Sequence, residues 1–160
     1  MPAKPNPVPE GYHTLTPYLI VDGAAQAIAF YKAAFGAVER LRLDGPGGTV
    51  GHAELVIGGS AIMLADEHPE FGALGPKTLG GSPVTLHLYV DDADAWVARA
   101  VAAGATVTRP VEDQFYGDRI GGVKDPFGYV WYCATRQEDL SVAELRRRSE
   151  EHLRKARKEG

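Results

Sequence analysis

The side chains best suited to chemistry lie in the stretch "GHAELVIGGSAIMLAD", residues 51–66, which places His52 and Glu54 two positions apart. If this segment is a β-strand, both side chains project from the same face, because side chains alternate along a strand with a period of two. An imidazole beside a carboxylate can ligate a divalent metal, transfer protons, or form a hydrogen-bonded structural pair. Which role applies depends on the elements around the pair.

An internal repeat organises the chain. Residues 15–37, "LTPYLIVDGAAQAIAFYKAAFGA", have the same order of features as residues 84–105, "VTLHLYVDDADAWVARAVAAGA". Each segment holds a β-type run, an acidic junction, an alanine-rich helical stretch and a Gly-Ala exit, and Leu19 corresponds to Leu88 at an offset of 69 residues. Such self-similarity indicates a duplicated structural unit. We therefore expect an α+β protein of two tandem βαβββ modules, followed by a C-terminal helix.

Composition suggests where the modules begin and end. The N-terminal residues are rich in proline, and a Gly- and Pro-rich segment follows the first module, so neither predicts regular structure. The latter segment is either a linker or a flap over a site. Ser141 and Glu144 fit a capping box and predict a mostly solvated helix in the tail. The expected divisions are a flexible arm over 1–11, a first module over 12–66, a loop over 67–83, a second module over 84–135 and a helical tail over 136–160.

The two alanine-rich stretches predict helices with defined ends. We expect Asp22 to cap the first helix and Gly36 to end it. The second helix begins among three aspartates between 91 and 94, where the helix dipole favours negative charge, and Gly104 ends it. The expected buried sides carry Ile28, Tyr31 and Phe35 in the first helix and Ala93, Val97 and Val101 in the second.

Charge and composition exclude several classes of protein. A net charge of −4 over 160 residues argues against a nucleic-acid binder that depends on phosphate contacts. No apolar run is long enough to span a bilayer, and no signal-peptide pattern is present. Cys133 is the single cysteine, so an internal disulfide is impossible, and its apolar surroundings predict an inert buried thiol. We expect a cytoplasmic protein that binds neither nucleic acid nor membrane.

The duplicated unit, with "YLIVDGAAQAIAFYKAAFGA" in the first copy and "VKDPFGYVW" in the second, resembles the vicinal oxygen chelate superfamily. This superfamily includes glyoxalase I, extradiol dioxygenases and the bleomycin-resistance proteins. The resemblance covers residues 12–135 and implies curved mixed sheets that enclose a concave cleft, with helices outside. It also implies a homodimer. It does not decide between an enzyme and a binding protein, because the superfamily holds both.

The resemblance further implies four metal-ligand positions on the concave face, one on the first and one on the last strand of each unit. In this sequence those positions hold Thr16, Met63, Thr85 and Tyr132. Two hydroxyls, a thioether and a phenol are poor ligands for an ion that prefers imidazole or carboxylate. The usual ligand quartet is therefore absent.

Alternation predicts which other side chains face the cleft. In the first strand it buries Leu15, Leu19 and Val21 and leaves Thr16 and Tyr18 facing inward. In the strand after Pro83 it leaves Thr85, His87 and Tyr89 facing inward.

The two hairpins add further residues to this face. A tight "DPFG" turn would place Tyr132 across from Gly121, with Arg119 on the same face, and the same pairing in the first copy would place His52 across from Met63. The expected ligand contacts are Thr16, Tyr18, His52, Glu54, Met63, Thr85, His87, Tyr89, Arg119 and Tyr132.

Several functions remain open for these residues. The aromatic side chains favour a metal-free pocket for a small aromatic or anionic molecule, in which Arg119 clamps an anionic group or merely pairs with a neighbouring aspartate. A displaced metal site would use His52, Glu54 and His87, as in a metal-dependent glyoxalase-like lyase, isomerase or dioxygenase. His52 held by Glu54 could also act as a base without metal, or the pair could be structural. We favour metal-free binding, with no cofactor, and keep a divalent metal as the alternative.

Overall fold

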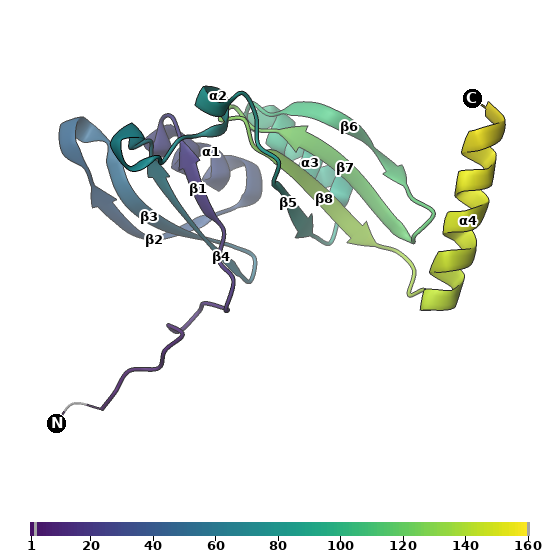
Figure 1. Cartoon of the computed structure of the whole chain (residues 1–160), viewed down its shortest axis with the longest axis horizontal. Helices are drawn as coiled ribbons and strands as arrows, with labels where there is room; N and C mark the ends of the chain where they lie inside the picture. Colours follow the sequence, from purple (N-terminus) through teal and green to yellow (C-terminus); the bar gives the residue numbers. More distant parts are fainter. Residues whose placement is uncertain (2, 160) are drawn as a thin grey trace. The chain divides into compact units, whose positions relative to one another are not determined.

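The computed structural model describes residue 1 and residues 3–159, and these residues divide into two units. The first unit runs to Pro83 and includes Pro126–Tyr129; the second holds Val84–Asp125 and the residues from Val130 onward. Each unit contains one four-stranded sheet with a helix packed against it (Figure 1). The expected α+β fold with two βαβββ repeats and a C-terminal helix is confirmed.

The first unit has the sheet order β1-β4-β3-β2, in which β1 is parallel to β4 and the other pairs are antiparallel. Its core lies between the sheet and α1, where Tyr31, Phe35 and Leu64 are fully buried. The elements are β1 (Tyr18–Val21), α1 (Ala24–Phe35), β2 (Val38–Asp44), η1 (Pro46–Gly48), β3 (Val50–Ile57), β4 (Ser60–Asp66), η2 (Pro69–Phe71) and α2 (Pro76–Leu79).

The second unit repeats this arrangement with the sheet order β5-β8-β7-β6. Trp131 is the largest fully buried side chain, and its indole nitrogen donates a hydrogen bond of 2.8 Å to the buried Asp125. The thiol of Cys133 is fully buried, and this burial raises its pKa to about 11, as an inert thiol requires. The elements are β5 (Thr85–Tyr89), α3 (Ala93–Ala103), β6 (Thr106–Asp113), β7 (Asp118–Lys124), β8 (Val130–Arg136) and α4 (Val142–Glu159).

The structure corrects the predicted cap of the first helix. Asp22 is exposed, and the N-cap residue is Gly23, which has no side chain to accept a hydrogen bond. The Asp66 carboxylate, at the end of β4, instead accepts hydrogen bonds from the backbone nitrogens of Gly23 and Ala24, at 2.9 and 2.8 Å. Sequence proximity suggested the wrong aspartate, because the capping residue comes from a neighbouring strand. Gly36 ends the helix in the left-handed conformation, as expected.

Two buried positions and one loop were also predicted wrongly. Leu15 is 87% exposed because the chain does not enter β1 until Tyr18, and Val101 is 41% exposed because Ala100 takes the buried position on α3. The loop after β4 contains the short helices η2 and α2, despite its glycines and prolines. Proline at the first turn of each short helix explains this, since that position needs no donor.

Candidate functional site

The open face of the second sheet, meaning the side that α3 does not cover, carries a row of aromatic rings. Parallel pairing of β5 with β8 sets His87 beside Tyr132 and Tyr89 beside Ala134, so these side chains share one face. The ring of His87 lies 4.9 Å from that of Tyr89 and 6.3 Å from that of Tyr132. Thr85 begins the same strand on the same face. Four of the predicted ligand contacts are thus brought together within this unit.

A cavity of about 610 Å³ lies at one end of this row. Sheet residues form its floor, and the segment that leads into α4, together with α4 itself, supplies apolar walls. Tyr89 is the one predicted site residue among those that line it. The lining residues are Tyr89, Tyr116, Asp118, Arg136, Glu138, Leu140 and Leu145.

Asp118 is the buried charged group of the cavity. Its residue is 6% exposed, and its Oδ2 accepts a hydrogen bond of 2.9 Å from the phenol of Tyr89. This hydrogen bond to the carboxylate, together with burial, raises the pKa of Tyr89. In the register of β7 with β8, the Asp118 position lies opposite that of Arg136, so both residues are on the open face. The phenol is therefore held protonated, with its oxygen fixed against the carboxylate.

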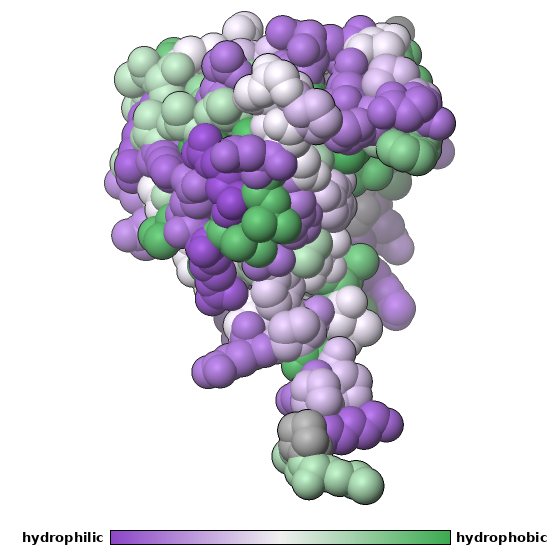
Figure 2. All heavy atoms as spheres, turned by 90° about the vertical axis from the view of Figure 1, so that its left-hand side faces the viewer, coloured by the Kyte–Doolittle hydropathy of each residue, from purple (hydrophilic) through white to green (hydrophobic). Residues whose placement is uncertain are grey.

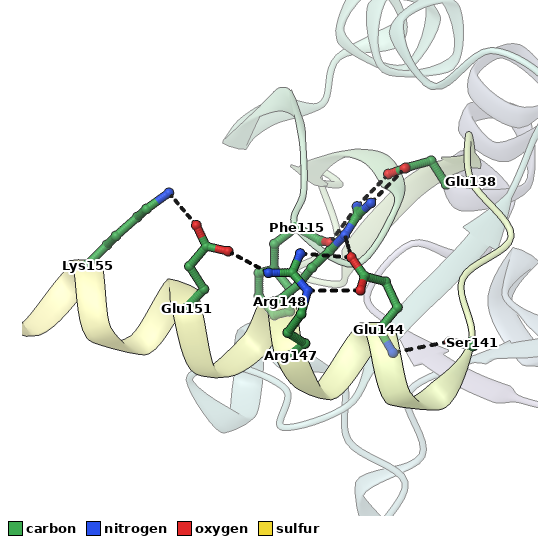
Figure 3. A network of polar contacts seen from close by, with 8 residues as sticks. All are labelled: Phe115, Glu138, Ser141, Glu144, Arg147, Arg148, Glu151 and Lys155. Atoms are coloured by element: carbon green, nitrogen blue, oxygen red, sulfur yellow. Dashed lines mark hydrogen bonds and ion pairs between the residues drawn. The ribbon is translucent and has the colours of Figure 1, made fainter.

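A network of charged side chains attaches α4 to the rest of the second unit (Figure 3). The Arg148 guanidinium donates to both carboxylate oxygens of Glu138, at 2.7 and 3.0 Å, and to the carbonyl of Phe115. The ring of His152 stacks on Phe115 with centroids 4.9 Å apart. Ser141 accepts a hydrogen bond from the backbone nitrogen of Glu144, which confirms the predicted N-cap. These contacts place Leu145 in the cavity wall.

Arg119 does not share a face with Tyr132, so that prediction is wrong. Tyr132 pairs with Gly122 rather than Gly121, and Arg119 pairs with Thr135. A register shift of one residue moves a side chain to the other face. The Arg119 guanidinium accordingly reaches α3, where it donates to Asp94 at 2.6 and 3.0 Å and also pairs with Asp113 at 3.1 Å. The structural pair, rather than the ligand clamp, is what its contacts support.

On the first sheet, the open face is the side turned away from α1, and four predicted residues lie there. Glu54 pairs with Met63, which pairs with Tyr18 on its other side, and His52 lies two positions along from Glu54. The predicted pairing of His52 with Met63 is therefore wrong by two residues, although the shared face is right. The remaining predicted residue, Thr16, lies before β1 begins.

Exposed apolar side chains extend the same face onto the edge strand β2. The register pairs Leu41 with Glu54 and Leu43 with His52, and these leucines are 38% and 53% exposed. Figure 2 looks onto the first unit and shows small apolar groups, in green, set among polar side chains. The two leucines therefore lie beside a polar cluster that includes His52 and Glu54.

His52 is the centre of that polar cluster. Its Nδ1 lies 2.8 Å from the phenol oxygen of Tyr18, and its Nε2 lies 3.2 Å from Oε1 of Glu54. A neutral imidazole that donates from Nε2 to the carboxylate would accept the Tyr18 proton at Nδ1. Burial raises the pKa of Tyr18, which favours the protonated phenol that such an arrangement needs.

Tyr12, a residue that the sequence did not single out, completes the cluster. Its phenol oxygen is buried without a hydrogen bond of ordinary geometry among the described residues. It nevertheless lies close enough to Glu54 for each group to change the pKa of the other. Burial and the carboxylate raise the pKa of Tyr12 to about 12. The phenol, followed by His52, lowers the pKa of Glu54.

The residues at the four family ligand positions do not fit a divalent metal. They offer two threonine hydroxyls, a thioether and a phenol, and Met63 has the half-buried surroundings of a packed side chain. Within residue 1 and residues 3–159, no three side chains of His, Cys, Asp or Glu come together as a metal centre needs.

Most of the cavity residues could not be found from sequence. Tyr116 and Asp118 lie in "DQFYGDR", the segment that also holds Arg119. Arg136, Glu138, Leu140 and Leu145 carry no local signal, because they line the cavity only once α4 is packed beside β8.

No helix in the described part of the chain is both long and apolar enough to cross a membrane.

An uncharacterised protein of Mycobacterium tuberculosis strain H37Rv is 47% identical to this chain over 134 residues, which is 82% of this chain and 79% of that protein. The X-ray structure of an Arabidopsis thaliana gene product matches with a TM-score of 0.63 and 33% identity, covering 77% of this chain and 98% of that one.

A crystal structure of a Pseudomonas aeruginosa protein matches with a TM-score of 0.63 and 28% identity, covering 79% of this chain and 99% of that one. Residues 12–132 match the family model of the Glyoxalase/Bleomycin resistance protein/Dioxygenase superfamily. The match covers about three quarters of the chain, and the chain has the two βαβββ units, so the protein belongs to the Glyoxalase/Bleomycin resistance protein/Dioxygenase superfamily.

Proposed function

We propose that this protein binds a small organic molecule with a flat ring in the cavity of the second unit, without a metal ion. The observation that carries the proposal is the cavity itself: about 610 Å³, with two tyrosines and two leucines among its lining residues. Pockets for small molecules usually enclose between about 300 and 1,000 Å³ and combine apolar walls with a few polar groups.

The polar groups of the cavity are few and held in place. Tyr89 is fixed by its hydrogen bond to Asp118, and Glu138 is fixed by Arg148. A ring lying between Tyr89 and Tyr116 would gain aromatic contact as well as burial. His87 and Tyr132 continue the aromatic row beyond the cavity and offer further contact to a longer molecule.

A binding experiment with three matched probes tests the proposal. The probes are 2-naphthylmethylamine, 2-naphthalenemethanol and 2-naphthoate, which share one ring system and differ in charge. Titration followed by ¹H–¹⁵N NMR should shift the amides around Tyr89, Tyr116 and Leu145 for at least one probe.

Two tryptophan variants make the experiment specific to the cavity. Leu145→Trp fills the cavity wall and should weaken binding by about tenfold or more. Val142→Trp lies on the same helix, at a residue that is 62% exposed and does not line the cavity, and it should bind as the wild type does. Equal affinity of the two variants, or no binding of any probe to the wild type, would contradict the proposal.

A second candidate function is proton transfer on the first unit, favoured by the placement of His52 between Tyr18 and Glu54. A hydroxyl, a base and an orienting carboxylate in series form the arrangement that acid–base catalysts use. It requires the Nε2–H tautomer of His52, which ¹⁵N NMR of the imidazole distinguishes directly. The Nδ1–H tautomer would contradict this candidate.

A further inference from the structure

Asp118 is an unusual group for a largely apolar cavity. The residue is 94% buried, and in the described part of the chain its carboxylate receives one side-chain hydrogen bond, from Tyr89. An ionised carboxylate can accept about four hydrogen bonds, so most of its capacity is unused by side chains. A buried charge is costly unless another group pairs with it.

The other charged side chains of the cavity already have partners. Glu138 holds both oxygens against Arg148, and Arg136 forms an ion pair with Asp139. Among the described residues, Asp118 is in no ion pair within 4.0 Å, unlike Glu138 and Arg136. The unmatched charge of the cavity is therefore negative and lies beside an aromatic ring.

We infer that the molecule bound in this cavity carries a positively charged amine or amidine, which pairs with Asp118 while its ring lies against Tyr89 and Tyr116. The inference rests on the proposed function and adds the chemical class of the ligand. A nitrogen cation supplies donors to the open positions of the carboxylate, and the tyrosine ring faces favour the same charge.

Arg136 provides the competing arrangement. It lies directly across from Asp118 in the pairing of β7 with β8, although its guanidinium contacts Asp139 instead. If Arg136 turned inward in solution, Asp118 would be neutralised internally and the cavity would favour neutral or anionic molecules. The charge preference of the ligand therefore decides between the two arrangements.

The three naphthyl probes measure this preference. We expect the amine to bind at least about tenfold more tightly than the alcohol, with the carboxylate weakest, because a charge-assisted hydrogen bond in a buried site exceeds a neutral one by about this much. Asp118→Asn should reduce the affinity for the amine to about that for the alcohol. Asp91→Asn removes the same charge at an exposed position outside the cavity and should leave all three affinities unchanged.

The outcomes separate this inference from the proposed function. Equal binding of the three probes in the cavity, tighter binding of the carboxylate, or unchanged amine affinity in Asp118→Asn would overturn the inference and leave the binding function standing. Absence of binding by every probe would overturn both. If Asp118→Asn does not fold, the ranking of the three probes in the wild type and in Asp91→Asn decides alone.

Discussion

Asp66 and Thr135 occupy the same position in the two repeats, 69 residues apart, and both bind the start of the helix in their own unit. Asp66 Oδ1 accepts a hydrogen bond of 2.8 Å from the backbone nitrogen of Ala24, and Thr135 Oγ1 accepts one of 2.8 Å from that of Ala93. The last strand of each unit therefore positions the helix that packs on its sheet. This shared contact is independent support for the duplication.

Replacing Asp66 should destabilise the first unit. The carboxylate also accepts a hydrogen bond of 2.7 Å from the backbone nitrogen of Val50, so Asp66→Ala removes the partner of three backbone donors. We expect the free energy of unfolding to fall by about 2–3 kcal/mol, measured by urea denaturation. Asp22→Ala, at the exposed residue that sequence favoured as the cap, should change it by less than about 0.5 kcal/mol. Equal effects of the two substitutions would refute the assigned cap.

Removing the Tyr89 hydroxyl should leave the Asp118 carboxylate buried without its phenol donor. We expect Tyr89→Phe to lower the free energy of unfolding by about 1–3 kcal/mol. Tyr132→Phe removes a hydroxyl in the same aromatic row that has no hydrogen bond among the described residues, and it should cost less than about 0.5 kcal/mol. Comparable losses in the two variants would show that the Tyr89–Asp118 contact contributes nothing particular.

Glu54 should make stability depend on acid pH. Its pKa is lowered in the folded protein, first by the phenol of Tyr12 and then by His52, while burial opposes the shift. A lowered carboxyl pKa contributes stability above the unfolded pKa, and that contribution is lost as pH falls through the folded pKa. Glu54→Gln should therefore be less stable than the wild type near pH 7, by about 1 kcal/mol. The difference should shrink as pH falls below the unfolded glutamate pKa of about 4.3, and it should be lost once pH lies below the lowered folded pKa.

Urea denaturation at a series of pH values measures this difference. Glu10→Gln, at an exposed residue of the N-terminal arm, is the matched control and should follow the wild type at every pH. A gap between Glu54→Gln and the wild type that stays constant with pH would assign the effect to packing rather than to charge.

Ligand binding should not depend on a divalent metal. The four family ligand positions hold poor ligands for such an ion, and the cavity lies against Tyr89 and Asp118. We expect the affinity for 2-naphthylmethylamine to stay within about twofold after EDTA treatment and after reloading with Zn²⁺, Ni²⁺ or Mn²⁺. Stoichiometric metal that is retained on dialysis and lost in His52→Ala would support the displaced metal site instead.

The fold was accessible from sequence because the repeat and the period-two pattern are local signals. Leu19, Ile28 and Tyr31 are buried, as the pattern predicts. His52 and Glu54 share a face with Met63, as predicted, because an error of two residues in the strand register leaves each side chain on the same face of the sheet. The register of a hairpin is harder to predict from sequence than the order of the elements. A one-residue error in the β7–β8 turn was enough to assign Arg119 to the wrong side of the sheet.

The cavity could not be predicted from the sequence, because its walls come from segments that no sequence pattern places next to one another. Leu145 reaches it only because Arg148, one turn farther along α4, bonds Glu138 and the Phe115 carbonyl. In the sequence, Asp118 cannot be told from an ordinary polar loop residue. Only the structure shows that it is buried and bonded to Tyr89.

Intermolecular NOEs to bound 2-naphthylmethylamine show directly whether a small molecule occupies the cavity of the second unit. We expect NOEs from the naphthyl protons to the cavity residues Tyr89, Tyr116, Leu140 and Leu145. NOEs to Tyr18 and His52 of the first unit without any to these four residues, or the absence of binding, would contradict it.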